Sequence, residues 1–326
     1  MIVKLKNKDF NDEIIKIITK KNLEVKIIDD LTFLIIGETT NIEPRDLYAF
    51  SSVLEVVRIS TPFKKVSRAY KSSDTIINLP NNIKIGGNNF TVIAGPCSVE
   101  SEEQLTIIAK ALKKANVNIM RAGAFKPRTS PYAFQGLEEE GLKLLKKVAD
   151  SENLLVVSEI PSPEYIPLFE ETVDIIQVGA RNMQNYHLLK ALGKAKKPIL
   201  LKRGLSATIE EWLMAAEYLI EHGNDNIILC ERGIRTFEKY TRNTFDISAV
   251  LAVKELSHLP VITDPSHATG RWEMVERLSL ASKVVGANGI MIEVHNEPTK
   301  ALSDGAQSLN LTNFNKLMEK LWLLNL

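Results

Sequence analysis

The sequence has few cysteines, few aromatic residues and almost no net charge. Of its 326 residues only two are Cys and 6% are Phe, Trp or Tyr, while 41 Lys and Arg offset 40 Asp and Glu to leave +1. Two cysteines are too few for a disulfide scaffold, so we expect each thiol to serve as a metal ligand, a nucleophile or part of the core. A balanced charge gives no reason to expect binding to nucleic acid or to a membrane surface.

Long apolar runs are also missing. No stretch approaches the ~18 residues of a membrane-spanning helix, and the segment MIVKLKNKDF lacks the apolar core of a secretory signal. We therefore expect a cytoplasmic protein. Hydrophobic residues at 44% and charged residues at 25% are typical of globular proteins, and the length accommodates a large barrel with a small appended domain.

Residues 1–62 predict a small separate domain. The segment DFNDEIIKIITKKN places Ile14, Ile17 and Ile18 at helical spacing, and LEVKIIDDLTFLIIGE has an acidic pair between two β-rich runs, as in a hairpin. A second helix and a closing strand follow, which completes a βαββαβ pattern of ferredoxin-like type. Residues 63–87 are predicted to form a linker and then a hairpin, IINL and IKIG, that caps the bottom of the next domain.

Residues 88–326 alternate short apolar runs with helix-length segments. The eight runs are FTVIAGPC, IMRAGA, LLVVSEI, IIQVGA, ILLKRG, IILCER, VITDPSH and GIMIEVH. Alternating strands and helices imply a parallel sheet, and eight units are the number in a closed (β/α)8 TIM barrel. An open doubly wound sheet is the alternative, but AGPCSVE is not the Gly-rich fingerprint that usually follows its first strand. We predict the α/β fold class with the barrel architecture.

Basic residues gather where the predicted strands end. Catalytic groups of such barrels lie at the carboxyl ends of the strands. The cations there are Arg121, Lys126, Arg128, Arg181, Lys202, Arg203 and Arg232. Their convergence predicts a pocket for phosphate or carboxylate groups. The alternative is ordinary ion pairing with Glu159, Glu231 and Glu293. In the loop FKPRTSPYAFQG, two cations stand with Thr129 and Ser130 as donors for a phosphate.

Four further residues have the chemistry of a metal site. Barrel closure brings the eighth strand, which holds Glu293, beside the first, which ends at Cys97; His267 ends the seventh, and Asp304 follows the eighth. Sulfur, imidazole and carboxylate donors together suit one divalent transition ion such as Mn, Fe, Co or Zn. Taken singly, each has a structural explanation, since a buried Cys is usually core and a His near a strand end often bonds to backbone.

At these residues the sequence resembles the 3-deoxy-D-arabino-heptulosonate 7-phosphate synthases. The signatures are AGPCSVE, RAGAFKPRTSPYAFQG, VGARNMQN, ITDPSHATGR and EVHNEP with ALSDGAQSL, from about residue 88 onward. The resemblance implies a condensation of phosphoenolpyruvate with erythrose 4-phosphate and water, at the start of the shikimate pathway of aromatic amino acid biosynthesis. It implies that Cys97, His267, Glu293 and Asp304 ligate the metal.

The resemblance also implies roles for the cations. Phosphoenolpyruvate would lie among Arg121, Lys126, Arg181, Lys202 and Arg232, and the phosphate of erythrose 4-phosphate would meet Arg128 and Thr129. We expect Lys126 to polarise or protonate the aldehyde oxygen, which makes it, with Cys97 and His267, a predicted catalytic residue. The N-terminal region is similar to a regulatory extension that binds an aromatic amino acid, and members of the family form homo-oligomers, often homotetramers.

Three other functions compete with this prediction. The sister enzyme that makes 3-deoxy-D-manno-octulosonate 8-phosphate from arabinose 5-phosphate shares the barrel, but its strand-two loop differs from KPRTS and its metal-free members lack an equivalent of Cys97. A Schiff-base aldolase could use Lys202, which sits inside a strand, but it would not need the four metal donors. A ligand-responsive interaction module with an inactive barrel would not need complete cation and donor sets.

Overall fold

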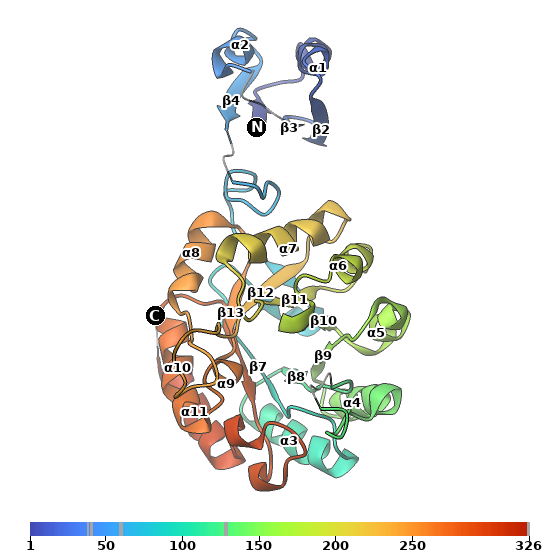
Figure 1. The fold of residues 1–326 in the computed structure, drawn as a ribbon, viewed down its shortest axis with the longest axis vertical. Helices are drawn as coiled ribbons and strands as arrows, with labels where there is room; N and C mark the ends of the chain where they lie inside the picture. The colour runs from blue at the N-terminus through green and yellow to red at the C-terminus, as the bar shows by residue number, and fades with distance from the viewer. Residues whose placement is uncertain (38, 40–41, 59–60, 127–129, 325–326) are drawn as a thin grey trace. The chain divides into compact units, whose positions relative to one another are not determined.

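The computed structural model describes residues 1–326 apart from 38, 40–41, 59–60, 127–129 and 325–326. It divides into two compact units, Met1–Ser72 and Ser73–Leu326. Figure 1 shows a small α/β unit and a barrel ringed by helices. No helix in the described part of the chain is long and apolar enough to cross a membrane.

The first unit has the predicted βαββαβ order. Its elements are β1 (Ile2–Leu5), α1 (Asn11–Lys20), β2 (Glu24–Asp29), β3 (Thr32–Ile36), α2 (Pro44–Tyr48) and β4 (Val53–Val57). The strands form one antiparallel sheet in the order β2-β3-β1-β4. Helix α1 buries Ile14 and Ile18 against this sheet, while Ile17 is 38% exposed. The unit extends to Ser72 and thus includes the start of the segment predicted as a linker.

The acidic pair marks the hairpin of this sheet, as predicted. Strand β2 ends at Asp29, and the side chain of Asp29 accepts a 2.8 Å hydrogen bond from the backbone N–H of Leu31. An aspartate that bonds to the backbone two residues ahead offers the chain an alternative to extended pairing, which is why the strand stops there.

The second unit is the predicted closed barrel of eight parallel strands. These are β7 (Thr91–Gly95), β8 (Ile119–Arg121), β9 (Leu155–Glu159), β10 (Ile175–Val178), β11 (Ile199–Lys202), β12 (Ile227–Glu231), β13 (Val261–Thr263) and β14 (Gly289–Glu293). Strand β14 pairs with β7 over five residues, from Gly289 with Thr91 to Glu293 with Gly95. This pairing closes the barrel and brings the first and eighth strands together, as the sequence predicted. The strands are almost wholly buried because helices cover their outer face and side chains fill the interior.

Helices follow the strands around the outside of the barrel (Figure 1). They are α3 (Glu102–Lys114), α4 (Glu138–Ser151), α5 (Ile166–Thr172), α6 (Tyr186–Leu192), α7 (Ile209–Glu221), α8 (Ser248–Leu256), α10 (Trp272–Val284) and α11 (Leu311–Leu323). Polar caps fix several of their starts: Ser101 accepts from the N–H of Gln104, and Thr208 and Glu211 form a reciprocal capping box.

A short hairpin closes the amino-terminal end of the barrel. It consists of β5 (Ile77–Asn78) and β6 (Lys84–Ile85), which pair antiparallel. Ile77 and Ile85 are fully buried in one cluster with interior residues of the strands, including Ile93 and Ile119. The predicted hairpin cap is therefore present, and the opposite end of the barrel is left for ligands.

One predicted strand was too long. We expected VITDPSH to be extended as far as His267, but β13 ends at Thr263 and His267 lies in a short helix, α9 (Pro265–Thr269). The side chain of Asp264 caps this helix by accepting a 2.9 Å hydrogen bond from the N–H of His267. Pro265 supplies a fixed φ at the first helical position and needs no hydrogen bond there.

Candidate active site and metal centre

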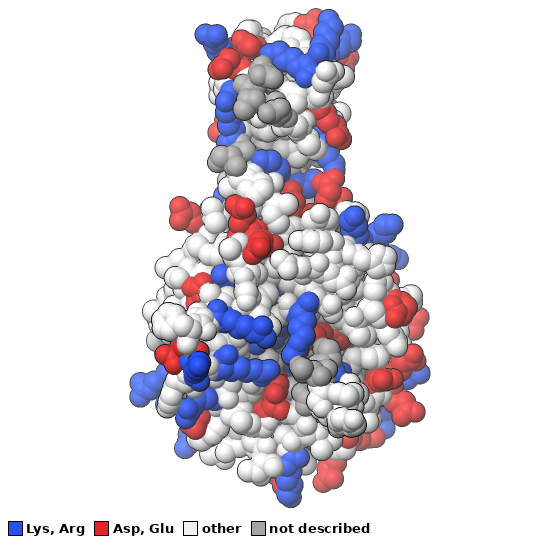
Figure 2. Space-filling model, in the orientation of Figure 1, with Lys and Arg blue, Asp and Glu red and all other residues white. Residues whose placement is uncertain are grey.

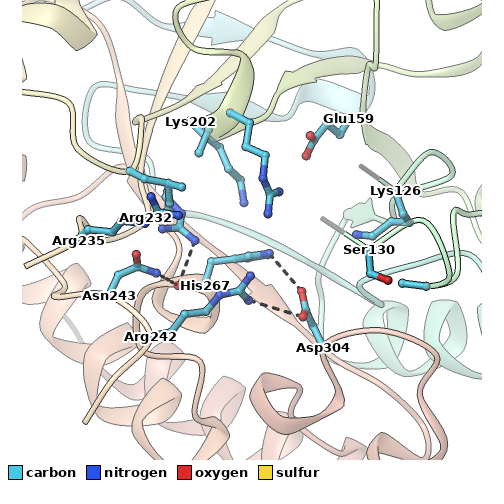
Figure 3. A pocket seen from close by; sticks show the side chains of 14 residues that line it. Lys126, Ser130, Glu159, Lys202, Arg232, Arg235, Arg242, Asn243, His267 and Asp304 are labelled. Carbon is cyan, nitrogen blue, oxygen red and sulfur yellow. Dashed lines mark hydrogen bonds and ion pairs between the residues drawn. The ribbon is translucent and has the colours of Figure 1, made fainter. Parts of the chain in front are cut away.

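A cavity of about 380 Å³ lies at the carboxyl ends of the barrel strands. Its lining holds six basic side chains, drawn with their neighbours in Figure 3: Lys126, Arg181, Lys202, Arg232, Arg235 and Arg242. Glu159, Asp304 and His267 also line it. Figure 2 shows Lys and Arg side chains gathered near the middle of one face of the barrel. The cavity is strongly cationic although the whole chain is nearly neutral.

The four predicted metal ligands converge at this end of the barrel. Donor atoms of Cys97, Glu293 and Asp304 all lie within 4.8 Å of one another, and Sγ of Cys97 is 3.4 Å from Oδ2 of Asp304. Nε2 of His267 is 3.4 Å from Oε1 of Glu293 and 4.0 Å from Oδ2 of Asp304. One sulfur, one imidazole nitrogen and two carboxylates fit a divalent first-row transition ion. The four residues therefore form a candidate site for a divalent metal ion.

Lys126 lies against the cysteine of this set. Its Nζ donates to both Sγ and the backbone oxygen of Cys97, each at 3.0 Å. Burial, together with the charge of Glu293, raises the pKa of the Cys97 thiol to about 11, although the Lys126 ammonium acts in the opposite direction. A thiol with this pKa is protonated at neutral pH and is therefore not an activated nucleophile; a bound cation would deprotonate it, because metals bind cysteine as the thiolate.

A buried carboxylate faces His267 from the other side. Nδ1 of His267 lies 2.8 Å from Oδ2 of Asp264, whose side chain is wholly buried. Burial lowers the pKa of His267, which outweighs the opposite effect of the charges on Asp264 and Glu293. A neutral imidazole with a carboxylate beside Nδ1 leaves its Nε2 lone pair on the side of Glu293 and Asp304, where it could bind a metal ion.

Ion pairing accounts for some of the predicted cations. Arg121 contacts Glu293 at 2.9 Å and donates to the backbone oxygen of Pro96 at 2.7 Å. Arg203 is held by Glu231 at 2.9 Å and by Asp246 at 2.8 Å, and it does not line the cavity. The alternative of ordinary ion pairing therefore holds for Arg203, which belongs to the framework of the barrel.

Other cations have no such partner. Arg181 and Arg232 line the cavity and make no ion pair with any described carboxylate. Arg232 donates instead to the backbone oxygens of Gly233 and His267, at 3.2 and 3.3 Å. The predicted residues Arg128 and Thr129 lie outside the described residues, whereas their neighbour Ser130 lines the cavity.

The sequence reasoning missed three cavity residues beyond β12. Arg235, Arg242 and Asn243 come from the segment before α8. Arg242 lies 3.6 Å from Asp304 and donates to Oε1 of Gln307 at 2.9 Å, while Asn243 donates to the backbone oxygen of His267 (Figure 3). The available signal was the run RGIRTFEKYTRN, which carries repeated basic residues directly after a strand.

Comparison with known proteins decides the family. Residues 74–325 match the model of the DAHP synthetase I family. The chain belongs to this family. It is 51% identical to the phospho-2-dehydro-3-deoxyheptonate aldolase of Thermotoga maritima over 287 residues, which is 88% of this chain and 85% of that protein.

Solved structures agree with this membership in the DAHP synthetase I family. The chain superposes on the crystal structure of the DAHP synthase of Thermotoga maritima with a TM-score of 0.80 at 46% identity, covering 99% of this chain and 95% of the other. A truncated form of the Thermotoga maritima 3-deoxy-D-arabino-heptulosonate 7-phosphate synthase gives a TM-score of 0.75 at 49% identity, covering 80% of this chain and 95% of that one.

The sister activity is represented at lower identity. The 2-dehydro-3-deoxyphosphooctonate aldolase of Geobacter sulfurreducens is 32% identical over 259 residues, which is 74% of this chain and 94% of that protein. The difference in identity favours the heptulosonate branch of the DAHP synthetase I family, as the loop KPRTS predicted.

Proposed function

We propose that this chain catalyses the metal-dependent condensation of phosphoenolpyruvate with erythrose 4-phosphate and water, giving 3-deoxy-D-arabino-heptulosonate 7-phosphate and phosphate. The observation that carries the proposal is the meeting of two sets of side chains at one end of the barrel. Four metal-donor residues stand beside a cavity lined by six cations. The relative at 51% identity bears the name of this activity.

The cations would hold the two anionic substrates. Arg121, Lys126, Arg181, Lys202 and Arg232 are assigned to phosphoenolpyruvate, and Arg128 and Thr129 to the phosphate of erythrose 4-phosphate. The Nε of Arg121 is buried and has no hydrogen-bond partner among the described residues, and Arg121 lies behind Glu293 rather than in the lining of the cavity. Two phosphates side by side repel each other in water, and the cluster offsets this repulsion while it fixes their orientation.

The reaction joins C3 of phosphoenolpyruvate to the aldehyde carbon, and water adds at C2 before phosphate leaves. Lys126 would polarise or protonate the aldehyde oxygen, a role supported by its Nζ lying beside Cys97 and lining the cavity. Cys97, His267, Glu293 and Asp304 would hold one divalent ion of Mn, Fe, Co or Zn. When bound, such an ion supplies Lewis-acid stabilisation of charge that develops on oxygen.

The first unit is proposed to bind an aromatic amino acid, tyrosine or phenylalanine, and to regulate the barrel. Its βαββαβ order and antiparallel sheet support this role, since the barrel does not need them for its own closure. We also propose that the enzyme acts in the cytoplasm as a homo-oligomer, a homotetramer in the first instance. A kinetic assay of the full chain against a chain that begins at Ser73 tests the regulation: tyrosine or phenylalanine should inhibit only the full chain.

The activity is tested on protein that has been stripped with a chelator and then restored with Mn²⁺. Loss of phosphoenolpyruvate absorbance is followed with erythrose 4-phosphate and, separately, with arabinose 5-phosphate. We expect metal-dependent consumption with the four-carbon sugar alone. Cys97→Ala should abolish it, whereas Cys230→Ala, at the other buried cysteine, should retain it. Consumption with the five-carbon sugar alone would transfer the assignment to the sister enzyme.

A Schiff-base mechanism at Lys202 makes a different prediction. Lys202 is buried, and its Nζ is held in an ion pair with Asp264, so it is not free to attack a carbonyl carbon. Borohydride with a carbonyl substrate should therefore leave the protein mass unchanged.

A further inference from the structure

Asp264 is a wholly buried carboxylate at the end of β13 that contacts two parts of the active site at once. Its Oδ2 lies 2.8 Å from Nδ1 of His267 and forms an ion pair with Nζ of Lys202. Its Oδ1 accepts from the backbone N–H of His267 at 2.9 Å. The Asp264 side chain therefore contacts the ring and the backbone of His267 as well as the side chain of Lys202.

These contacts fix the direction in which His267 points. The backbone bond sets the first turn of α9. The carboxylate also lies 2.8 Å from Nδ1, as a charge contact without the geometry of a hydrogen bond, and it is the acidic group that faces this side of the ring. With the ring held in this way, Nε2 faces Glu293 and Asp304, at 3.4 and 4.0 Å. Carboxylates at the second nitrogen of a metal-binding histidine orient the ring and strengthen it as a ligand.

The same oxygen also holds Lys202, which points into the cavity from β11. Lys202 is assigned to phosphoenolpyruvate, whereas His267 is assigned to the metal. Because Oδ2 is shared, a shift of the ammonium toward a bound phosphate changes the contact at the imidazole, and the reverse also holds. The two sites are thereby joined through one buried atom.

We propose that Asp264 is a positioning residue that couples the metal ligand His267 to the substrate-facing Lys202. The inference rests on the proposed function, because it takes the metal site and the phosphoenolpyruvate site from it. Asp264 is not a ligand in this proposal and does not touch substrate. Its role is to make the affinity for metal depend on bound phosphoenolpyruvate, and by linkage the affinity for phosphoenolpyruvate depends equally on metal.

Asp264→Asn tests the proposal with little change of shape. Asparagine keeps an oxygen that can cap α9, but it removes the charge shared by Lys202 and His267. In the full chain, the affinity for Mn²⁺ is measured by competition with a chelator, without substrate and at saturating phosphoenolpyruvate. We expect the variant to bind Mn²⁺ about 10–100-fold more weakly without substrate. The factor by which phosphoenolpyruvate tightens Mn²⁺ binding should fall toward one.

Asp246→Asn is the matched control. Asp246 also pairs with a buried cation, Arg203 at 2.8 Å, but it contacts neither His267 nor Lys202 in the described structure. This control should keep the wild-type affinity for Mn²⁺ and the wild-type factor by which phosphoenolpyruvate tightens Mn²⁺ binding. If Asp264→Asn keeps both values within twofold of wild type, the proposal is wrong. It is also wrong if Asp246→Asn loses them to the same extent, because the effect would then be a general loosening of the barrel.

Two further variants keep the test decisive. Lys202→Met leaves Asp264 in place and serves as the test if Asp264→Asn does not fold. This variant should by itself reduce the factor by which saturating phosphoenolpyruvate tightens Mn²⁺ binding. An unchanged factor would overturn the proposal. Cys97→Ala tests the proposed metal site separately. If the wild type binds Mn²⁺ and Cys97→Ala does not, the metal site stands whatever Asp264→Asn does. If Cys97→Ala binds as the wild type does, the proposed function itself fails.

Discussion

The ammonium of Lys126 donates hydrogen bonds to both the thiol and the backbone oxygen of Cys97, each at 3.0 Å. This pairing places a proton donor beside a proposed metal ligand at the edge of the cavity, where the aldehyde of the second substrate would meet the first. We therefore expect a change at Lys126 to lower kcat even when both substrates are saturating.

Lys126→Met should lower kcat by about 10²–10⁴-fold with both substrates saturating, because a positioned proton donor contributes an effect of this size. Steady-state kinetics at saturating metal measure the change. Lys146→Met is the control, since Lys146 pairs with Asp150 on the surface of α4, and it should keep wild-type turnover. Turnover of Lys126→Met near the wild-type value would refute the assigned role.

A pair of buried serines joins the loops that carry Cys97 and Asp304. Oγ of Ser98 and Oγ of Ser303 are 2.7 Å apart, and each serine is adjacent in sequence to one of the two proposed ligands. Ser98→Ala leaves the buried hydroxyl of Ser303 without this partner, which should cost about 1–3 kcal/mol in the free energy of unfolding. It should also weaken metal binding, because the two loops that carry Cys97 and Asp304 are then held together less firmly. Urea unfolding and chelator competition measure the two effects.

The double variant provides the internal check on this pair. Replacing both serines removes both polar groups, so Ser98→Ala with Ser303→Ala should cost less than the sum of the single changes. Strict additivity would mean that the two hydroxyls do not support each other.

Gly95 lets β7 approach β8 closely just before Cys97. Its φ is +152°, and a Cβ at this position would lie 2.1 Å from the backbone oxygen of Arg121. Gly95→Ala must therefore push the two strands apart where Arg121 and Cys97 are placed. We expect a loss of about 1–3 kcal/mol or more in unfolding free energy from strain and overpacking, with a marked loss of metal affinity. A variant with wild-type stability would contradict this account of the strand contact.

Much of the barrel can be predicted from the sequence because its strands are buried on both faces. Runs such as IIQVGA and IILCER stand out as apolar segments between amphipathic helices, and counting them gives the closed architecture. Barrel closure then places Glu293 beside Cys97 without any knowledge of side-chain geometry. Cys97 and Glu293 can therefore be grouped from the strand ends, whereas His267 lies in α9 and Asp304 in the loop after β14.

Other features depend on contacts between distant residues. His267 was placed at a strand end because VIT and the following residues read as one run, whereas the cap from Asp264 starts a helix there. Arg203 is one of the cations at the predicted strand ends, and only the structure shows Glu231 and Asp246 holding it. Asp264 carries no sequence signal of its coupling role, since its partners lie on β11 and α9.

The pairing of Asp246 with Arg203 predicts how stability depends on acid. Burial by itself would raise the pKa of Asp246, but hydrogen bonds from Ser248 and Arg203 and the charge of Arg203 lower it below the usual value. Glu231 faces the same guanidinium, and burial raises its pKa. As the pH falls, the unfolded chain protonates Asp246 before the folded chain does. The stability from Asp246 is therefore complete above the unfolded pKa near 4 and is lost as the pH falls through the lower folded pKa.

Asp246→Asn should therefore be less stable than the wild type at pH 7, and the difference in unfolding free energy should shrink toward zero below about pH 3. Urea unfolding of both proteins between pH 7 and pH 2.5 measures this difference, which also contains a change at Glu231, because the charge of Asp246 raises the pKa of Glu231. Asp150→Asn is the comparison, since Asp150 forms an exposed pair with Lys146 and should change stability little at any pH. A constant difference between Asp246→Asn and the wild type would show that the Asp246 carboxylate stabilises the fold through its shape and packing rather than through its charge.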